Sequence, residues 1–218
     1  MDGEFYTTVL YPIQDKVLAA IGLAETGFYL SGGTGASRGY LNHRFSDDLD
    51  LFVNDSREFS LWAGRVIQSV ADKRGWTTRV LMQEERFVRL VVSIAEVDLK
   101  VEMINDVPAH CGTIVDHPVL GRLDSSENIL ANKVTAALDR QEPKDFADIW
   151  GFCKINGLSL TEAIENADSK AAGVFPADLA RLLCSVTEAD YGVIRWQNPP
   201  PPDVYRADLI GLGESLIL

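Results

Sequence analysis

The hydrophobic pattern of the chain changes about halfway along. Residues 12–25 repeat apolar side chains every three or four positions, which predicts an amphipathic helix. A second helix is predicted over about 56–73, with Ser56 as its N-cap. Short apolar or alternating runs, each typical of a strand, occur at 28–30, 48–53, 77–82, 87–93 and 97–104.

From about residue 125 the periodicity becomes helical. The stretch 105–124 contains prolines and glycines and predicts a loop. Helices are then predicted at 126–139, 144–154, 159–167, 176–188 and 204–217. We therefore expect an α+β fold, in which a mixed sheet flanked by helices (1–124) is followed by a C-terminal helical bundle (125–218).

Composition places the chain among folded globular proteins. Of 218 residues, 46% are hydrophobic and 24% charged. No apolar run approaches the roughly 20 residues that cross a bilayer, and the N-terminus lacks a secretory pattern. The three cysteines are irregularly spaced, which predicts reduced thiols rather than disulfides or a zinc cluster. We expect a cytoplasmic protein with no membrane partner.

The chemistry is concentrated around two acidic residues. Asp48 and Asp50 alternate along the strand predicted at 48–53, so their carboxylates face the same way, whereas Asp47 is turned from them. Carboxylate oxygens suit Mg²⁺, and two such ions can bridge a triphosphate and stabilise leaving pyrophosphate. An isolated Asp-x-Asp is more often a solvated strand face, so its surroundings decide.

A glycine turn precedes this acidic pair. The run Gly32-Gly33-Thr34 ends the strand predicted at 28–30, and glycines let backbone N–H groups approach phosphate oxygens. Arg44 and Ser46 follow, and their side chains suit phosphate as a charge and a hydroxyl donor. A third carboxylate is expected from the polar face of the strand at 97–104, where Asp98 and Glu102 are both candidates.

The stretch GGTGASRGYLNHRFSDDLDLF resembles the first motif of the AbiEii/AbiGii toxin family, within the DNA polymerase β-like nucleotidyltransferases. Arg44, Ser46, Asp48 and Asp50 fill the motif position by position. Three further stretches, which resemble the second, third and fourth motifs in order, are LKVEMINDVP with Glu102, NKVTAALDR with Lys133, and PKDFADIW with Asp145 and Asp148.

The resemblance covers about residues 28–150, with two departures. Lys144 stands where the fourth motif usually has Arg, and Glu102 where the second commonly has Asp. Compared with Asp, Glu102 lengthens the arm that carries the carboxylate by one methylene group. No motif matches the chain after residue 155.

The resemblance implies a nucleotidyltransferase-type fold and a reaction that moves a nucleoside monophosphate from an NTP, such as ATP, to an acceptor hydroxyl. Mg²⁺ or Mn²⁺ would be the cofactor, and the chain would be a toxin with a cognate antitoxin and tRNA ends as acceptor. The implied metal ligands are Asp48, Asp50 and Glu102. Asp145 would assist by orienting Lys133 or accepting a proton. The implied triphosphate ligands are Gly32, Gly33, Thr34, Arg44, Ser46 and Lys133.

Charge leaves the acceptor open. Twenty Lys and Arg against thirty-two Asp and Glu give a net charge of −12, which disfavours non-specific binding to nucleic acid. A cationic small molecule, such as an antibiotic with a free hydroxyl, is the alternative acceptor. A non-catalytic module that binds nucleotide or a partner protein is the alternative from another class. A local basic set that suits RNA, or that is merely paired with nearby acids, comprises Lys73, Arg74, Arg79, Arg86, Arg89 and Lys100.

Overall fold

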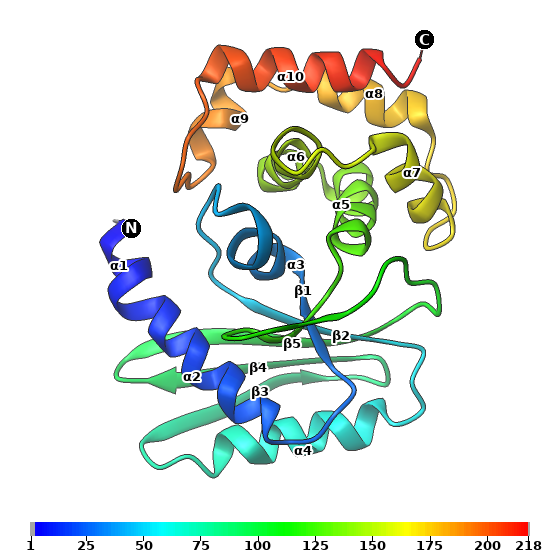
Figure 1. Cartoon of the computed structure of the whole chain (residues 1–218). Coiled ribbons are helices and arrows are strands. Elements are labelled where there is room, and N and C mark those ends of the chain that lie inside the picture. The colour runs from blue at the N-terminus through cyan, green and yellow to red at the C-terminus, as the bar shows by residue number, and fades with distance from the viewer. Residues whose placement is uncertain (1–2, 218) are drawn as a thin grey trace. The chain divides into compact units, whose positions relative to one another are not determined.

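A computed structural model describes residues 3–217 (Figure 1). The chain divides into two compact units, each taken by itself below. The first consists of the described residues up to Gly35 together with Ser46–Pro108 and Thr113–Asp124. The second consists of Ala36–Phe45, Ala109–Gly112 and the described residues from Ser125 on.

A seven-stranded mixed sheet forms the centre of the first unit. Its strand order is β3-β4-β5-β2-β1-β7-β6. β2 pairs in parallel with β5, and β1 in parallel with β7, while the other neighbours are antiparallel. The strands are β1 Tyr29–Ser31, β2 Leu49–Asn54, β3 Trp76–Gln83, β4 Phe87–Ile94, β5 Val97–Asp106, β6 Val115–His117 and β7 Gly121–Leu123.

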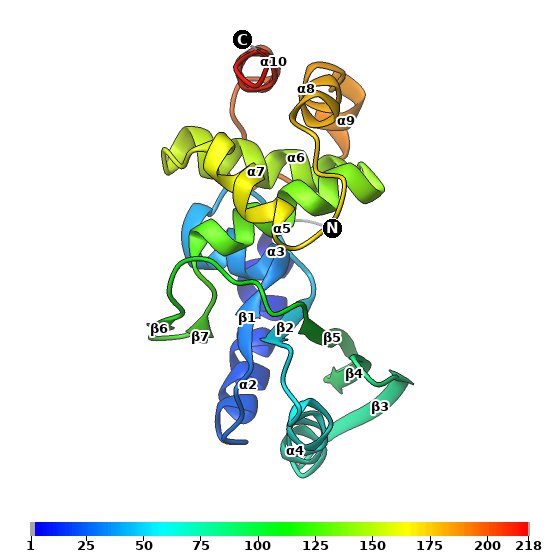
Figure 2. The ribbon, with the colours of Figure 1, turned by 90° about the vertical axis from the view of Figure 1, so that its right-hand side faces the viewer.

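One face of this sheet is apolar and covered by helices. Leu49 and Leu51 of β2 lie in register with Val101 and Met103 of β5, and all four are buried. Helix α2 (Tyr11–Gly22) packs against α4 (Phe59–Ala71), and α4 packs against β3 and β4. Figure 2 shows α2 and α4 on the same side of the strands. Burying alternate strand residues in this way leaves the intervening polar residues on the other face.

The sequence-based assignments for this unit need three corrections. The predicted loop at 105–124 contains the short strands β6 and β7. Ser56 is not the N-cap of α4, which follows Glu58; the Ser56 hydroxyl instead accepts a hydrogen bond from the Glu58 amide at 3.1 Å. Helical turns that the pattern did not predict occupy α1 (Gly3–Phe5) and the π-helical η1 (Tyr6–Leu10).

The second unit is helical and has its own apolar core. Among its largest fully buried side chains are Ile149, Phe152 and Tyr205. The predicted helix at 176–188 is in fact two helices, because Thr187 caps a new one through a reciprocal pair of hydrogen bonds with Asp190. The helices are α5 Ser126–Arg140, α6 Pro143–Trp150, the π-helical η3 Gly151–Ile155, α7 Leu160–Asp168, α8 Pro176–Cys184, α9 Glu188–Val193 and α10 Pro202–Glu214.

The segment at 36–45 belongs to this helical unit although it precedes most of the sheet in the sequence. Ala36 and Leu41 are buried in the helical core, and Gly151 leaves no room for a side chain against Leu41. The α+β fold class is confirmed, whereas the predicted division at 124/125 stays a prediction. Within the described residues, no helix is both long and apolar enough to cross a membrane.

Candidate active site

A row of polar side chains crosses the polar face of the sheet in the first unit. Asp50 of β2 is the register partner of Glu102 on β5 and of Ser31 on β1. Glu102 is in turn the register partner of Arg89 on β4. The Arg89 Nε donates to Glu102 Oε1 at 2.7 Å. Neighbouring strands therefore bring Arg89, Glu102, Asp50 and Ser31, which are up to 71 positions apart in sequence (31 to 102), into one line.

Lys100 links Asp48, the remaining predicted metal ligand, to Glu102 in this row. The Lys100 Nζ lies 2.8 Å from Asp48 Oδ2 and 3.3 Å from Glu102 Oε1. Partial burial alone would lower the pKa of Lys100, but hydrogen bonding and charge from Asp48, with Glu102, raise it above its ordinary value. Lys100 is therefore an ammonium ion held between two carboxylates.

Register also separates the two candidates for the third carboxylate. Glu102 stands opposite Asp50, whereas the register partner of Asp98 is Ser93 at the far end of β5. Asp98 forms an exposed ion pair with Arg79 at 3.1 Å. The geometry favours Glu102.

We call Asp48, Asp50 and Glu102 the acidic row, and the glycine turn lies directly against its member Asp50. Gly32 has φ +62°, a conformation that residues with side chains rarely adopt, and a Cβ there would collide with the Asp50 carboxylate. Gly32 is the first residue of the three-residue helical turn α3 (Gly32–Thr34). The Thr34 hydroxyl contacts Ser46 Oγ at 3.0 Å and the Asp48 carbonyl at 2.5 Å. These contacts fix the turn against the chain segment that carries Asp48.

Side chains of η1 and α2 hold the segment that contains Ser46 and Asp47. The Gln14 amide donates to the carbonyls of Ser46 and Asp47 at 3.2 and 2.9 Å. The Tyr6 hydroxyl donates to Asp47 Oδ1 at 2.7 Å. Asp47 thus turns away from the acidic row, as its parity predicts.

Asp48, Asp50 and Glu102 offer carboxylate oxygens only, the donor set that Mg²⁺ or Mn²⁺ takes. In residues 3–217, no three acidic, His or Cys side chains converge on one point as they stand. Lys100 occupies the position of a cation between two of the three. The three carboxylates therefore have the donor chemistry that a divalent ion needs, and the Lys100 ammonium would have to move for the ion to bind.

The second unit contains a buried polar network of its own around Asp148. The Arg44 Nε and Nη2 donate to Asp148 Oδ1 and Oδ2, both at 2.7 Å. The Lys133 Nζ lies 2.7 Å from Asp148 Oδ2 and 2.9 Å from Asp145 Oδ1. His43 Nε2 lies 3.0 Å from Asp148 Oδ1. These charged side chains are almost fully buried, so each depends on the others for its polar contacts.

The ionisation of this network follows from its contacts. Burial alone would raise the pKa of Asp148, but the charges of Arg44 and Lys133 hold it well below its ordinary value. Burial alone would lower the pKa of Lys133, but Asp148 and Asp145 raise it. Burial lowers the pKa of His43 despite its contact with Asp148, so His43 is neutral at pH 7. Two buried cations, Arg44 and Lys133, are thus held by two carboxylates, and the partly exposed Arg140 also binds Asp145.

A sequence model of the family described as nucleotidyl transferase AbiEii toxin, type IV TA system, matches residues 16–192. The chain belongs to this family. It is therefore a nucleotidyltransferase of the toxin type. No protein with curated annotation matches the sequence.

Solved structures agree with the fold of this AbiEii chain. MenT4, a nucleotidyltransferase toxin of Mycobacterium tuberculosis, is 16% identical, with a TM-score of 0.70 over 99% of this chain and 86% of that one. JHP933 of Helicobacter pylori is 21% identical, with a TM-score of 0.63 over 96% of this chain and 92% of that one. At these identities the likeness shows the fold alone.

Three residues that organise these groups in the AbiEii chain have no role that the sequence pattern assigns. The pattern identifies Asp148 only as part of a motif, gives His43 no partner, and places Lys100 in the local basic set. Two partners of Asp148, Arg44 and His43, lie 104 and 105 positions away, so no local pattern reveals them. Lys100 does carry a signal, because it shares strand parity with Glu102.

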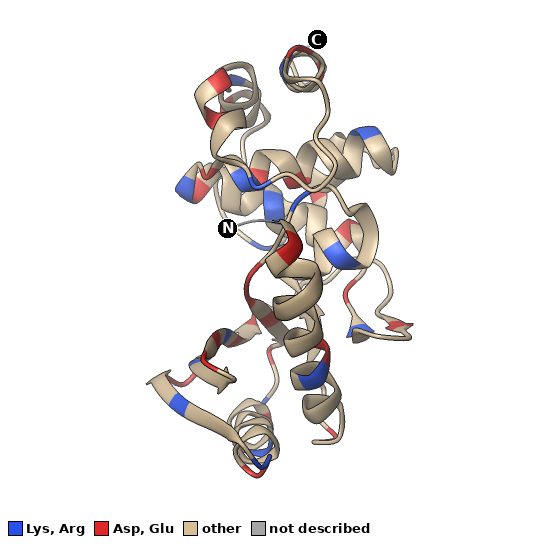
Figure 3. Cartoon of the chain, turned by 90° about the vertical axis from the view of Figure 1, so that its left-hand side faces the viewer, with Lys and Arg blue, Asp and Glu red and all other residues tan. Residues whose placement is uncertain are grey.

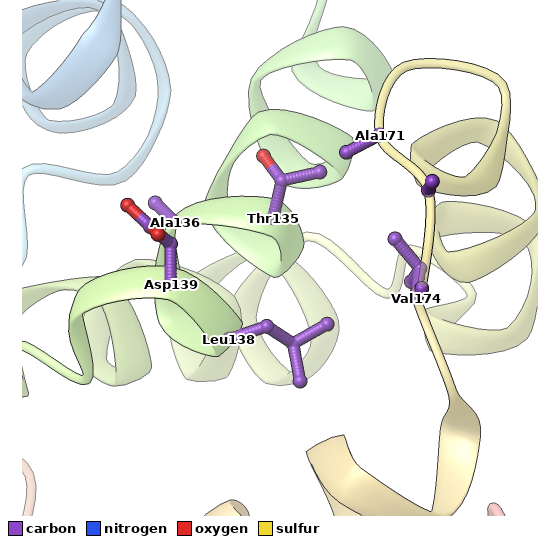
Figure 4. Close-up of a pocket in the computed structure, with 8 residues that line it drawn as sticks. Thr135, Ala136, Leu138, Asp139, Ala171 and Val174 are labelled. Carbon is purple, nitrogen blue, oxygen red and sulfur yellow. The ribbon is translucent and has the colours of Figure 1, made fainter.

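Pockets of different sizes lie within the helical unit of the AbiEii chain. One of about 450 Å³ lies between α5 and the segment 171–174, and Figure 4 shows Thr135 and Leu138 directed toward Ala171 and Val174. Of the predicted site residues, none lines it. A smaller pocket of about 180 Å³ borders the start of α6, where Arg44, Lys144 and Arg195 contribute to its wall.

Proposed function

We propose that this toxin is metal-dependent and transfers a nucleoside monophosphate from an NTP to an acceptor hydroxyl of tRNA. The observation that carries the proposal is the register of Asp50 with Glu102, next to Asp48 and the Gly32 turn. A bound Mg²⁺ would polarise the α-phosphate and stabilise the departing pyrophosphate.

The chain's own residues divide the remaining work. The Gly32-Gly33-Thr34 turn and Ser46 are proposed to bind phosphate oxygens, since the turn presents backbone N–H groups without side chains in the way. In the transfer, the acceptor hydroxyl loses its proton to water, its oxygen forms a bond to the α-phosphorus, and the bond between that phosphorus and the pyrophosphate oxygen breaks, so that pyrophosphate leaves. Asp48, Asp50 and Glu102 hold the metal.

The roles predicted for Arg44, Lys133 and Asp145 belong to the proposal as well. Burial alone would raise the pKa of Asp145, but Lys133 and Arg140 lower it, which makes the carboxylate a weak base. Of its two predicted roles, orienting Lys133 is therefore better supported than accepting the acceptor's proton. Lys133 and Arg44 would have to exchange part of their present carboxylate contacts for phosphate.

A cationic small molecule is the second candidate for the acceptor. Four members of the local basic set are paired with acids, which leaves less positive charge for RNA; the pairs are Arg79–Asp98, Arg86–Asp55, Arg89–Glu102 and Lys100–Asp48. Figure 3 shows acidic and basic positions interspersed in the sheet-containing unit. This pattern, with the net charge of −12, suits a cationic acceptor.

The test is transfer of label from each α-³²P-labelled NTP, with Mg²⁺, into total tRNA or into a panel of aminoglycosides. Label in tRNA that disappears in the double variant Asp48→Ala/Asp50→Ala supports the proposal. Label in aminoglycosides alone would replace tRNA by a small-molecule acceptor. Nucleotide binding without transfer at any Mg²⁺ or Mn²⁺ concentration would favour a non-catalytic module. Label transfer that persists in the double variant would overturn the assignment of the site.

An antitoxin partner is also proposed, since the family description names a toxin–antitoxin system. Expression of the chain in a bacterial host should arrest growth. Co-expression of the gene that adjoins it should restore growth, and arrest that persists with every adjoining gene would contradict a paired antitoxin.

A further inference from the structure

The Lys100 ammonium lies where a metal ion would bind. Its Nζ contacts Asp48 Oδ2 at 2.8 Å and Glu102 Oε1 at 3.3 Å, which are oxygens of two of the three proposed metal ligands. An ammonium ion and a divalent metal ion would both bind to these oxygens. The two cations cannot occupy the same position between the carboxylates at the same time.

The charge balance around the row explains why a cation is needed there. Asp48, Asp50 and Glu102 supply three negative charges, and Lys100 and Arg89 supply two positive ones. Neighbouring carboxylates without a counterion repel each other and would turn apart. Lys100 therefore keeps Asp48 and Glu102 facing one another when no metal is bound.

A second cation holds Glu102 when Lys100 moves away. Arg89 donates to Glu102 Oε1 at 2.7 Å and continues to hold that side chain when Lys100 moves. Asp48 has its ion pair with Lys100, whose side chain is 37% exposed. A flexible, partly exposed lysine can swing into solvent at small cost, in contrast to the buried Lys133.

We propose that Lys100 is a positioning residue that acts as an internal counterion, holding Asp48 and Glu102 in place until a divalent metal displaces it. The inference rests on the proposed metal-dependent function. It adds that metal and the Lys100 ammonium compete for the same carboxylate oxygens, so that Lys100 sets the metal concentration at which the enzyme becomes active.

The test is Mn²⁺ binding to the full-length protein, measured by calorimetry without nucleotide, in wild type and Lys100→Met. Since exposed ion pairs are weak, the variant should bind Mn²⁺ about three- to tenfold more tightly. Arg79→Met is the matched control, because it removes one positive charge from an exposed ion pair on the same sheet. Its Mn²⁺ affinity should equal that of wild type.

Two outcomes of the Lys100→Met measurement overturn the inference. Unchanged Mn²⁺ affinity would mean that Lys100 and the metal do not compete. Weaker affinity in a variant that melts like wild type would mean that Lys100 supports the metal rather than opposing it. If Asp50→Asn binds Mn²⁺ as well as wild type does, the metal lies elsewhere and the proposed metal site fails too.

A spectroscopic readout tests the displacement of Lys100 in the wild-type protein. With ¹⁵N-labelled lysine, the Lys100 ammonium, assigned by its loss in Lys100→Met, should give a resonance typical of an ion pair. Addition of Mg²⁺ should shift this resonance or remove it through exchange with water. A Lys100 resonance that stays unchanged at saturating Mg²⁺ would contradict displacement, even if nucleotidyl transfer itself is confirmed.

Discussion

Gly32 cannot receive a side chain without moving Asp50. Its φ is +62°, and a Cβ would collide with the Asp50 carboxylate. Gly32→Ala should therefore lower the free energy of unfolding by about 1–3 kcal/mol and lower the transfer rate more than tenfold, because the metal ligand is displaced. Urea denaturation and the label-transfer assay measure both effects.

Gly64→Ala is the matched control for that change. Gly64 lies within α4, and a Cβ added there would meet no atom within 4 Å and would need no positive φ. Alanine at this position should stabilise the protein by about 0.5–1 kcal/mol and leave transfer unchanged. Equal behaviour of the two alanine variants would contradict the role given to Gly32.

Asp148 is the single residue on which most of the buried charge in the helical unit depends. Asp148→Asn should destabilise the protein by about 3–5 kcal/mol, because it leaves Arg44 and Lys133 without their shared carboxylate. Asp139→Asn, at an exposed position of α5, should change stability by less than about 0.5 kcal/mol. Thermal and urea unfolding compare the two, and a mild effect of Asp148→Asn would mean that the network is not a structural unit.

At the scale of elements, α5 and α6 are joined by the ion pairs of Lys133 and Arg140 with Asp145. The pKa of Asp145 is lowered in the folded state, so its stabilisation is complete above the ordinary aspartate pKa and is lost as pH falls through the lower folded value.

The pH dependence of Asp145→Asn follows from this direction. At pH 7 the variant should be less stable than wild type by about 1.5–3 kcal/mol, since hydrogen bonds to a charged group are lost. The difference should stay constant between about pH 5 and pH 8 and should shrink below about pH 4. Urea denaturation at stepped pH measures it, and a difference that grows toward acid would contradict the depressed pKa.

The helical unit also depends on an element that lies far away in the sequence. Residues 36–45 contribute Ala36 and Leu41 to its core and Arg44 to its buried network. A fragment of residues 125–218 should therefore fail to fold cooperatively, although it contains all of α5 to α10. Circular dichroism with thermal melting tests this, and a sharp transition in the fragment would show that 125–218 is an independent domain.

For the whole molecule, local alternation and short apolar runs predict β1 to β5 correctly, while the roles of Asp48, Asp50 and Glu102 stay predictions. Asp48 and Asp50 share a parity, and the apolar positions of β5 fix Glu102 on the opposite, polar face. The pairing of Asp50 with Glu102 needs strand order, which no local pattern contains. The Asp148 network escapes prediction for the same reason, since its cations come from segments 15 and 104 positions away.

Short elements escape prediction on physical grounds as well. β6 and β7 have three residues each, too few to display alternation, and exist because β7 pairs with β1. The helix predicted at 176–188 passes over the end of α8 at Cys184 and the start of α9 at Glu188. The capping box at Thr187 begins α9, and apolar spacing alone does not contain this signal.

The central claim is that nucleotidyl transfer takes place at the row formed by Asp48, Asp50 and Glu102. The most direct measurement is pyrophosphate release from NTP in the presence of Mg²⁺ and acceptor, comparing wild type with Asp50→Asn and Asp98→Asn. Asp50→Asn should lose at least about a hundredfold in rate, since a metal ligand is removed, while Asp98→Asn should keep the wild-type rate. Full activity of a folded Asp50→Asn variant would contradict the account.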